Sequence, residues 1–125
     1  MPATARWWCR RTGTAAHDCL PHNPAWALRA MVAYDRYLFL RTPPRFGGFD
    51  RLWLALRAYN RGKSHWRAEA ASTGLAAPTR QQIDAACGQA RRAALHCREN
   101  LDYPRRILLV LQPGYADWGP VWRAP

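Results

Sequence analysis

Apolar residues recur at helical spacing along most of the chain, and the longest such stretch follows Asn23. The Asn23 side chain offers an oxygen that can cap a helix, and Pro24 pre-sets the backbone angle of a first helical position. Apolar positions then recur every three or four residues up to Arg41, and Pro43 and Pro44 follow. The pattern predicts a helix over residues 24–41 with a buried stripe of Ala27, Ala30, Met31, Tyr34 and Leu38.

A second helical stretch follows a glycine-containing segment. Residues 46–49 read FGGF, which is typical of a turn. Helical spacing resumes over residues 49–60, and Gly62 supplies a stop signal. Residues 62–77 give a weaker signal, with a short helix expected around residues 66–71. The stripe of the 49–60 helix comprises Phe49, Leu52, Trp53, Leu56 and Tyr59.

The next helix begins with a capping signal. Thr79 is followed three residues later by Gln82, the spacing of a capping box. We predict one helix over residues 80–100, with small residues on its inner face: Ile83, Cys87, Ala90, Ala94 and Cys97. A last helical segment is expected over residues 103–111, before Pro113.

The fold class predicted from these patterns is all-α. No segment shows strand alternation and none repeats, so we expect a single domain over residues 1–125. Residues 1–22 are expected to form a loop-rich start with one short helical turn, residues 23–112 a helical body, and residues 113–125 a tail. A 49% apolar composition with 7 Trp, 5 Tyr and 3 Phe is globular, and no apolar run is long enough to predict a membrane span.

Four cysteines leave the redox state open. They show no CxxC pair and no histidine at zinc-finger spacing, so no structural metal site is predicted. Cys87 and Cys97 fall on one predicted helix, where ten residues span about 15 Å, too far for a disulfide. A Cys9–Cys19 bridge is the plausible pairing and would fit an exported protein. Buried free thiols are the alternative.

The chain is strongly basic. It carries 19 Lys and Arg against 8 Asp and Glu, a net charge of +11. Such a field attracts a polyanion, such as nucleic acid, anionic lipid or an acidic cell-wall polymer. The excess of arginine over lysine is also what a GC-rich coding sequence produces, so the charge by itself selects no partner. A small helical nucleic-acid-binding protein is one alternative, although the arginines are scattered and no helix-turn-helix signature is present.

Four short motifs point in a more specific direction. Residues 58–62 read AYNRG, residues 1–5 read MPATA, residues 22–38 read HNPAWALRAMVAYDRYL, and residues 99–108 read ENLDYPRRIL. In their order along the chain, these motifs resemble segments of the soluble lytic transglycosylases, the lysozyme-like enzymes that cleave bacterial peptidoglycan, and especially those of tailed phages. The resemblance implies a lysozyme-like helical fold, periplasmic or virion-associated action on the β-1,4 bond between MurNAc and GlcNAc, and a 1,6-anhydro product.

The same resemblance implies that a part of the family's domain is missing. The family's catalytic glutamate and its G-L-x-Q segment would precede Met1, so this chain resembles the C-terminal part of the enzyme. We therefore expect an inactive or weakly active form, and we assign no catalytic residue. A chain without the packing partner of its core could also fail to fold and associate through exposed Trp and Leu faces.

The resemblance places three residues in a substrate groove. Tyr59 and Asn60 belong to the AYNRG motif and Tyr103 to the closing motif, and we expect them to bind the glycan. Many family members read Y-N-A-G or Y-N-G-G followed by another small residue, whereas this chain has Arg61 within the motif and Lys63 after it. The expected partner is a peptidoglycan strand, bound by a monomer without a cofactor or metal and without specific nucleic-acid binding.

The remaining polar and aromatic candidates have ordinary structural explanations. Glu69 and Glu99, the two glutamates, are expected to be solvated helix residues rather than substitute acids. The histidines show no metal spacing and are expected at the surface or at caps: His17, His22, His65 and His96. The core candidates are Trp7, Trp8, Trp26, Trp53 and Trp66, whereas Trp118 and Trp122 are expected to fold back from the tail.

Overall fold

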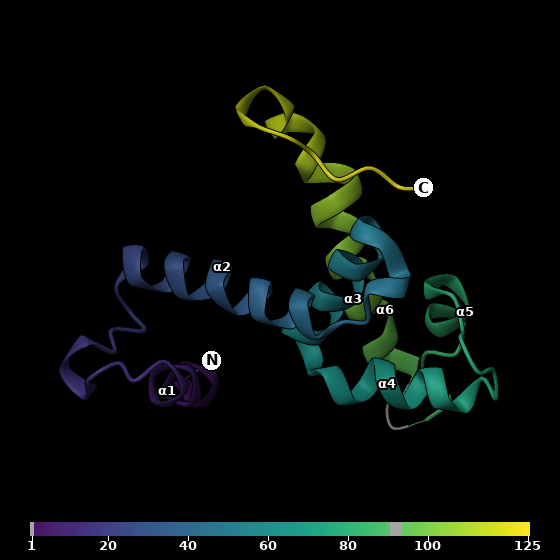
Figure 1. Cartoon of the computed structure of the whole chain (residues 1–125), viewed down its shortest axis with the longest axis horizontal. Helices are drawn as coiled ribbons and strands as arrows, with labels where there is room; N and C mark the ends of the chain where they lie inside the picture. The colour runs from purple at the N-terminus through teal and green to yellow at the C-terminus, as the bar shows by residue number, and fades with distance from the viewer. Residues whose placement is uncertain (1, 91–93) are drawn as a thin grey trace. The chain divides into compact units, whose positions relative to one another are not determined.

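The computed structural model describes residues 2–90 and 94–125 and divides the chain into two compact units. Unit 1 comprises residues 1–37 and unit 2 residues 38–125. The described residues form helices and no strand (Figure 1), so the all-α class is confirmed. None of the described helices is both long enough and apolar enough to cross a bilayer.

Unit 1 is built from one short helix, a turn and most of a long helix. Helix α1 spans Pro2–Arg11, η1 spans Ala16–Asp18, and α2 spans Pro24–Arg41 across the boundary between the units. The Asn23 side-chain oxygen accepts a hydrogen bond from the Trp26 backbone N–H at 3.1 Å, which confirms the predicted cap and the 24–41 helix. The loop-rich start is more helical than predicted, because α1 has ten residues.

A disulfide and an aromatic cluster hold unit 1 together. Cys9 and Cys19 form the expected bridge, with their Cα atoms 6.0 Å apart. The Arg11 guanidinium lies 4.7 Å from the centre of the Tyr37 ring. Four rings lie with centroids 5.8–6.1 Å apart, from Trp7, Trp8, Tyr34 and Tyr37. Aromatic contacts therefore hold α1 to α2 where few aliphatic residues are buried.

Unit 2 packs around α3. It contains η2 (Pro44–Phe46), α3 (Gly47–Arg61), α4 (Lys63–Ser72), α5 (Arg80–Ala85), α6 (Ala94–Arg105), η3 (Arg106–Leu111) and η4 (Gln112–Trp118). Three residues of the predicted α3 stripe, Phe49, Trp53 and Leu56, are buried and form a core with Leu108 of η3, whereas Leu52 and Tyr59 are half-buried. Trp66 of α4 is buried too, so Trp53 and Trp66 are core residues, whereas Trp7 is 36% exposed and Trp8 and Trp26 are half-buried.

The predicted FGGF turn is largely a helix start. Gly47 has a φ of 70°, which glycine adopts without strain, and α3 already begins there. Gly48 lies under the Trp122 ring, where a Cβ would come within 2.3 Å of Trp122 Cζ3. Trp122 also contacts Phe39, with ring centroids 5.7 Å apart. The tail therefore folds back through Trp122, but Trp118 is 87% exposed, contrary to expectation.

The single helix predicted over residues 80–100 is wrong. The capping box is present, because Thr79 and Gln82 exchange both hydrogen bonds, but α5 ends after only six residues. Gly88 has a φ of 87°, a left-handed conformation that interrupts the helix. Cys87 and Cys97 consequently come together, with Cα atoms 5.8 Å apart, and form the disulfide that a continuous helix would have excluded. The predicted Ala94 side chain lies outside the described residues.

The last predicted segment is a continuation of α6. Pro104 lies inside α6 instead of opening a new helix, and the π-helical η3 follows directly. A proline removes one backbone donor, and a wider turn accommodates the interrupted ladder. The helical path then continues as η4 through Pro113, beyond the predicted end.

Candidate functional site

The three residues expected to bind substrate lie together in unit 2. Tyr59 and Asn60 occupy the end of α3, and Tyr103 lies on α6. The Tyr59 and Tyr103 rings are stacked, with an interplanar angle of 4° and centroids 6.1 Å apart. Both rings are half-buried, and Tyr103 also packs on the core around Trp53. The site thus presents two aromatic side chains in a fixed mutual orientation.

Asn60 is oriented by a buried asparagine. Its side-chain oxygen accepts a hydrogen bond from Asn100 Nδ2 at 3.2 Å. Asn100, on α6, is fully buried, and the same amide nitrogen donates to the Arg57 backbone carbonyl at 3.0 Å. A polar contact therefore fixes the end of α3 against α6 directly beside the two tyrosines.

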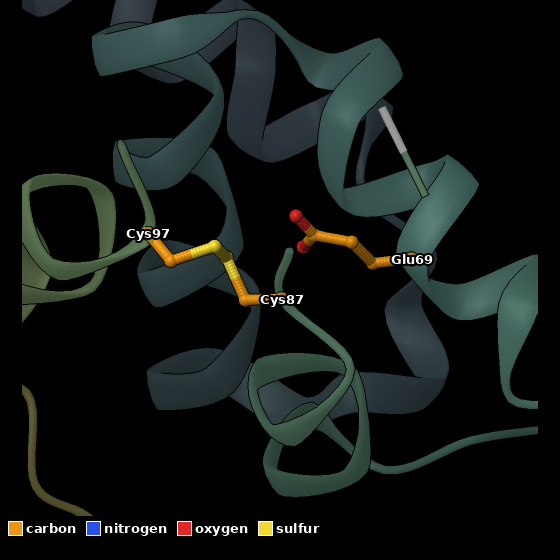
Figure 2. A group of neighbouring side chains, drawn as sticks. All are labelled: Glu69, Cys87 and Cys97. Atoms are coloured by element: carbon orange, nitrogen blue, oxygen red, sulfur yellow. A yellow bond between two sulfur atoms is a disulfide. The ribbon is translucent and has the colours of Figure 1, made fainter. Parts of the chain in front are cut away.

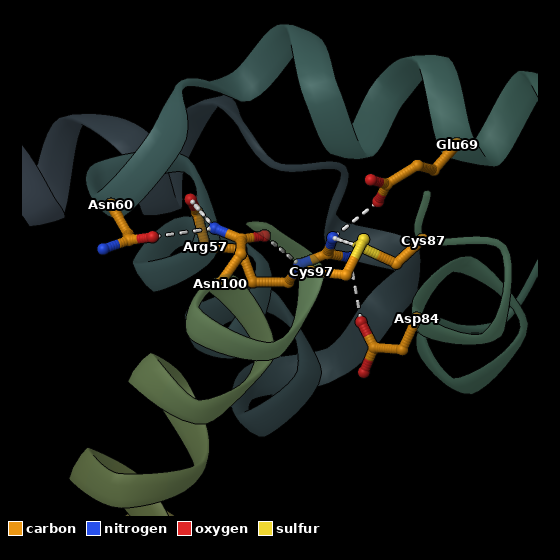
Figure 3. Close-up of a disulfide and its surroundings, with 7 residues drawn as sticks. All are labelled: Arg57, Asn60, Glu69, Asp84, Cys87, Cys97 and Asn100. Atoms are coloured by element: carbon orange, nitrogen blue, oxygen red, sulfur yellow. Dashed lines mark hydrogen bonds and ion pairs between the residues drawn. A yellow bond between two sulfur atoms is a disulfide. The ribbon is translucent and has the colours of Figure 1, made fainter. Parts of the chain in front are cut away.

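Behind this site lies a buried arginine that joins four helices (Figure 3). Arg57 is 1% exposed, and its Nε donates to Asn100 Oδ1 at 2.8 Å. Its Nη2 contacts Glu69 Oε2 of α4 at 2.5 Å, and its Nη1 contacts Asp84 Oδ1 of α5 at 2.9 Å. The same Nη2 lies 3.4 Å from Cys87 Sγ. We call these five residues the Arg57 cluster.

Glu69 is therefore not the solvated helix residue that the sequence predicted. Its side chain is 1% exposed, and burial of a carboxylate requires a charged or strongly donating partner, which Arg57 provides. Glu99, by contrast, is exposed as expected and pairs with Arg61 at the surface. Nothing in the local sequence around Glu69 marks the difference, because its partner is 12 residues away in the chain.

Asp84 links the Arg57 cluster to a second arginine. Arg80 contacts Asp84 Oδ2 and Asp50 Oδ1, both at 3.1 Å. Burial raises the pKa of Asp84, although Arg57 and Arg80 both act to lower it. The loss of hydration thus outweighs the two arginines.

Glu69, Cys87 and Cys97 resemble a metal-ligand set by proximity alone (Figure 2). One potential ligand atom from each lies within 4.8 Å of the others. The two sulfur atoms are bonded to each other, however, and a metal needs thiolates. The adjacent Arg57 guanidinium adds a positive charge that opposes a cation. The residues as found therefore build an ion pair beside a disulfide and do not fit a metal.

Unit 1 contains a perturbed carboxyl group that sequence reasoning missed. Burial raises the pKa of Asp35, on α2, to about 6. Its Oδ1 is buried and has no hydrogen-bond partner among the described residues. The sequence position of Asp35 could have indicated its burial. Asp35 lies beside Tyr34 and three residues before Leu38, and both of these residues belong to the predicted apolar stripe. A carboxyl group that is protonated near neutral pH has the property a general acid requires.

A pocket in unit 2 lies apart from the predicted site residues. It measures about 390 Å³, and neither tyrosine of the site lines it. Its wall includes Trp53, Arg80, Asp84, Leu101 and Arg105. The pocket is lined by the Trp53 ring and by the Arg80–Asp84 ion pair, so it lies where α3, α5 and α6 pack together.

Most of the histidines are exposed at the surface. His17 is 82% exposed in its side chain and lies 3.3 Å from Asp18, and His22 and His96 are also exposed. His65 is half-buried on α4, contrary to the surface expectation.

Comparison with protein-family models, curated proteins and solved structures gives no match.

Proposed function

We propose that unit 2 binds the glycan strands of bacterial peptidoglycan, as a lysozyme-like domain of the lytic-transglycosylase type. The observation that carries the proposal is the stacked pair of Tyr59 and Tyr103 with Asn60 beside it. These residues come from two motifs more than forty residues apart, and the resemblance assigned both to one groove. Aromatic faces pack on the C–H faces of sugars, while an amide exchanges hydrogen bonds with hydroxyl groups.

We further propose that unit 2 binds without cleaving. An acid for glycosidic cleavage must be protonated near neutral pH. Five of the six carboxylates in unit 2 are paired with arginines, and Asp117 is exposed. Each of these carboxylates therefore has either an arginine partner or open access to water, whereas such an acid requires an apolar pocket beside the sugar.

The binding can be tested by cosedimentation of the chain with purified peptidoglycan sacculi. We expect Tyr59→Ala and Tyr103→Ala each to weaken binding at least tenfold, which equals about 1.4 kcal/mol. Tyr59→Phe, which keeps the ring, should retain most of the binding. Tyr115→Ala is the matched control, because Tyr115 is a 63% exposed tyrosine in η4.

Two results would contradict this assignment. Equal binding by the wild type and the Tyr103→Ala variant, with both folded by circular dichroism, would remove the tyrosine pair from the site. Release of 1,6-anhydromuropeptides, detected by mass, would show that a carboxyl group of the chain acts as an acid. Asp35→Asn would then be the first variant to assay, because burial raises the pKa of Asp35 to about 6.

Nucleic-acid binding is less well supported by the arrangement of charges. Several arginines of unit 2 are held in ion pairs with carboxylates: Arg57, Arg61, Arg80 and Arg105. Phosphate binding would have to break these pairs or use the remaining scattered cations. Steeply salt-dependent binding to duplex DNA, unaffected by Tyr59→Ala, would favour this alternative.

A further inference from the structure

The C-terminal segment of unit 2 exposes several large apolar side chains. Trp118 is 87% exposed, Val110 65%, Tyr115 63%, Leu109 50% and Leu111 47%. These five, which we call the C-terminal apolar patch, lie within the ten residues 109–118 of η3 and η4. Large apolar side chains gathered on one exposed segment of a folded unit usually mark an interaction surface.

The segment that carries the patch is fixed in place. Gln112 Nε2 donates to the Leu108 and Trp122 carbonyls at 3.0 and 2.8 Å, and its Oε1 accepts from the Trp122 N–H at 2.7 Å. Leu108 is buried in the core, and Trp122 packs on Phe39. The segments η3 and η4 thus continue α6 away from the core (Figure 1). Leu108 at one end and Trp122 beyond the other end hold their conformation. The patch is therefore formed before any partner binds.

The charged residues around the patch are three arginines and two aspartates. Arg105, Arg106 and Arg123 flank it and are exposed, and Asp117 is the acidic residue within it. Arg105 also contacts Asp102 at 3.1 Å, a pair that is exposed on both sides. The whole chain adds a net charge of +11. A partner for this patch must therefore combine an apolar layer with negative charge.

We propose that the C-terminal apolar patch docks on the surface of an anionic lipid bilayer. Tryptophan and tyrosine favour the boundary between headgroups and acyl chains, and aliphatic side chains insert just below it. Arg106 and Arg123, which are exposed beside the patch, gain from the negative potential of anionic headgroups. A glycan or a nucleic acid offers no apolar layer to Val110 and Leu111. A second copy of the chain would bring one +11 charge against another.

The test is flotation of the full chain with vesicles that contain no glycan. Vesicles of phosphatidylcholine with about one third phosphatidylglycerol are compared with pure phosphatidylcholine at low and high salt. We expect binding to the anionic vesicles, weakened at least tenfold by Trp118→Ala and several-fold by Leu109→Ser. The matched control is Leu75→Ser, because Leu75 is 49% exposed between α4 and α5, outside the patch, and Leu109 is 50% exposed.

Several outcomes would overturn the proposal. These are an absence of binding to anionic vesicles at low salt, equal binding by the Trp118→Ala and wild-type chains, or an equal loss in the Leu75→Ser control. Self-association that Trp118→Ala abolishes, seen by analytical ultracentrifugation without vesicles, would assign the patch to a second copy instead. Because Trp118 and Leu109 are exposed, circular dichroism should show unchanged folding in these variants. Glycan binding at Tyr59 is tested separately, with sacculi. A negative result in that test would not change the conclusion on vesicle binding.

Discussion

Replacing Arg57 by methionine should destabilise unit 2 more than any surface change. The substitution keeps an unbranched apolar chain and removes the guanidinium, so the buried Glu69, which is 1% exposed, loses its ion pair with Arg57. Breaking a buried ion pair from one side costs about 3–5 kcal/mol. Asp84 keeps its contact with Arg80, and so contributes less to this loss. A domain of ordinary stability has only about 5–15 kcal/mol, so the effect is a large fraction of the total.

The assay is a double-mutant cycle measured by thermal and urea unfolding with the disulfides intact. A loss of about 4 kcal/mol should lower the melting temperature by roughly 15–30 °C. The Arg57→Met/Glu69→Met double variant should recover most of the loss, because it leaves no unpaired charge at this position. The coupling free energy should then be about 2–4 kcal/mol.

A surface pair in the same unit provides the matched control. Arg61 and Glu99 form an ion pair of the same chemical type, but their side chains are 37% and 59% exposed. The corresponding cycle with methionine should give a coupling below about 1 kcal/mol. The reasoning is refuted if Arg57→Met costs less than about 1 kcal/mol. It is also refuted if the Arg57 and Arg61 cycles give equal couplings.

Three further predictions concern other parts of the chain. Asp35→Asn should raise stability by about 1 kcal/mol at pH 8, after discounting for partial exposure, and by almost nothing at pH 4. The pKa of Asp35 is about 6 in the folded protein, above the unfolded value of 3.8. The wild-type protein therefore loses stability as the pH rises from 3.8 to about 6. Replacing Cys87 and Cys97 by serine should cost about 2–3 kcal/mol, since the bridge closes a loop with a separation of 10 residues. Gly48→Ala should displace Trp122 and cost about 1–3 kcal/mol, measured by unfolding and tryptophan fluorescence.

Each of these predictions has an internal control. For Asp35→Asn, an equal gain at pH 4 and pH 8 would mean that the carboxyl charge is not the cause. For the cysteine variant, a dithiol reductant should lower the melting temperature of the wild type, and a variant as stable as the oxidised wild type would contradict the estimate. For Gly48, the control is Gly114→Ala, because no atom lies within 4 Å of a Cβ at Gly114.

The local features of the fold could be predicted because their causes are local. The Asn23 cap, the capping box that starts at Thr79 and the apolar stripe from Phe49 to Leu56 each depend on residues within a few positions of one another. The pairing of Tyr59 with Tyr103 could be anticipated only through the resemblance of two motifs. No periodicity relates residues so far apart.

The two main errors have different causes, one local and one distant. One glycine, Gly88, interrupts a helix that the apolar pattern alone would continue, and this changes the partner available to Cys87. The sequence also shows Glu69 among small and charged neighbours, which is typical of a solvated position. Only the packing of α3 against α4 brings Arg57 to it and makes its burial possible.

The all-α class, most helix starts and the positive charge can be predicted from the amino-acid sequence alone, because propensity, capping and composition act along the chain. Which carboxylates are buried and which apolar residues remain exposed follows from the packing of the helices on one another. These properties depend on the electric field and the solvent exposure produced by elements 12 to 43 residues apart, such as the partners of Arg57. They are consequently invisible to any short window of sequence.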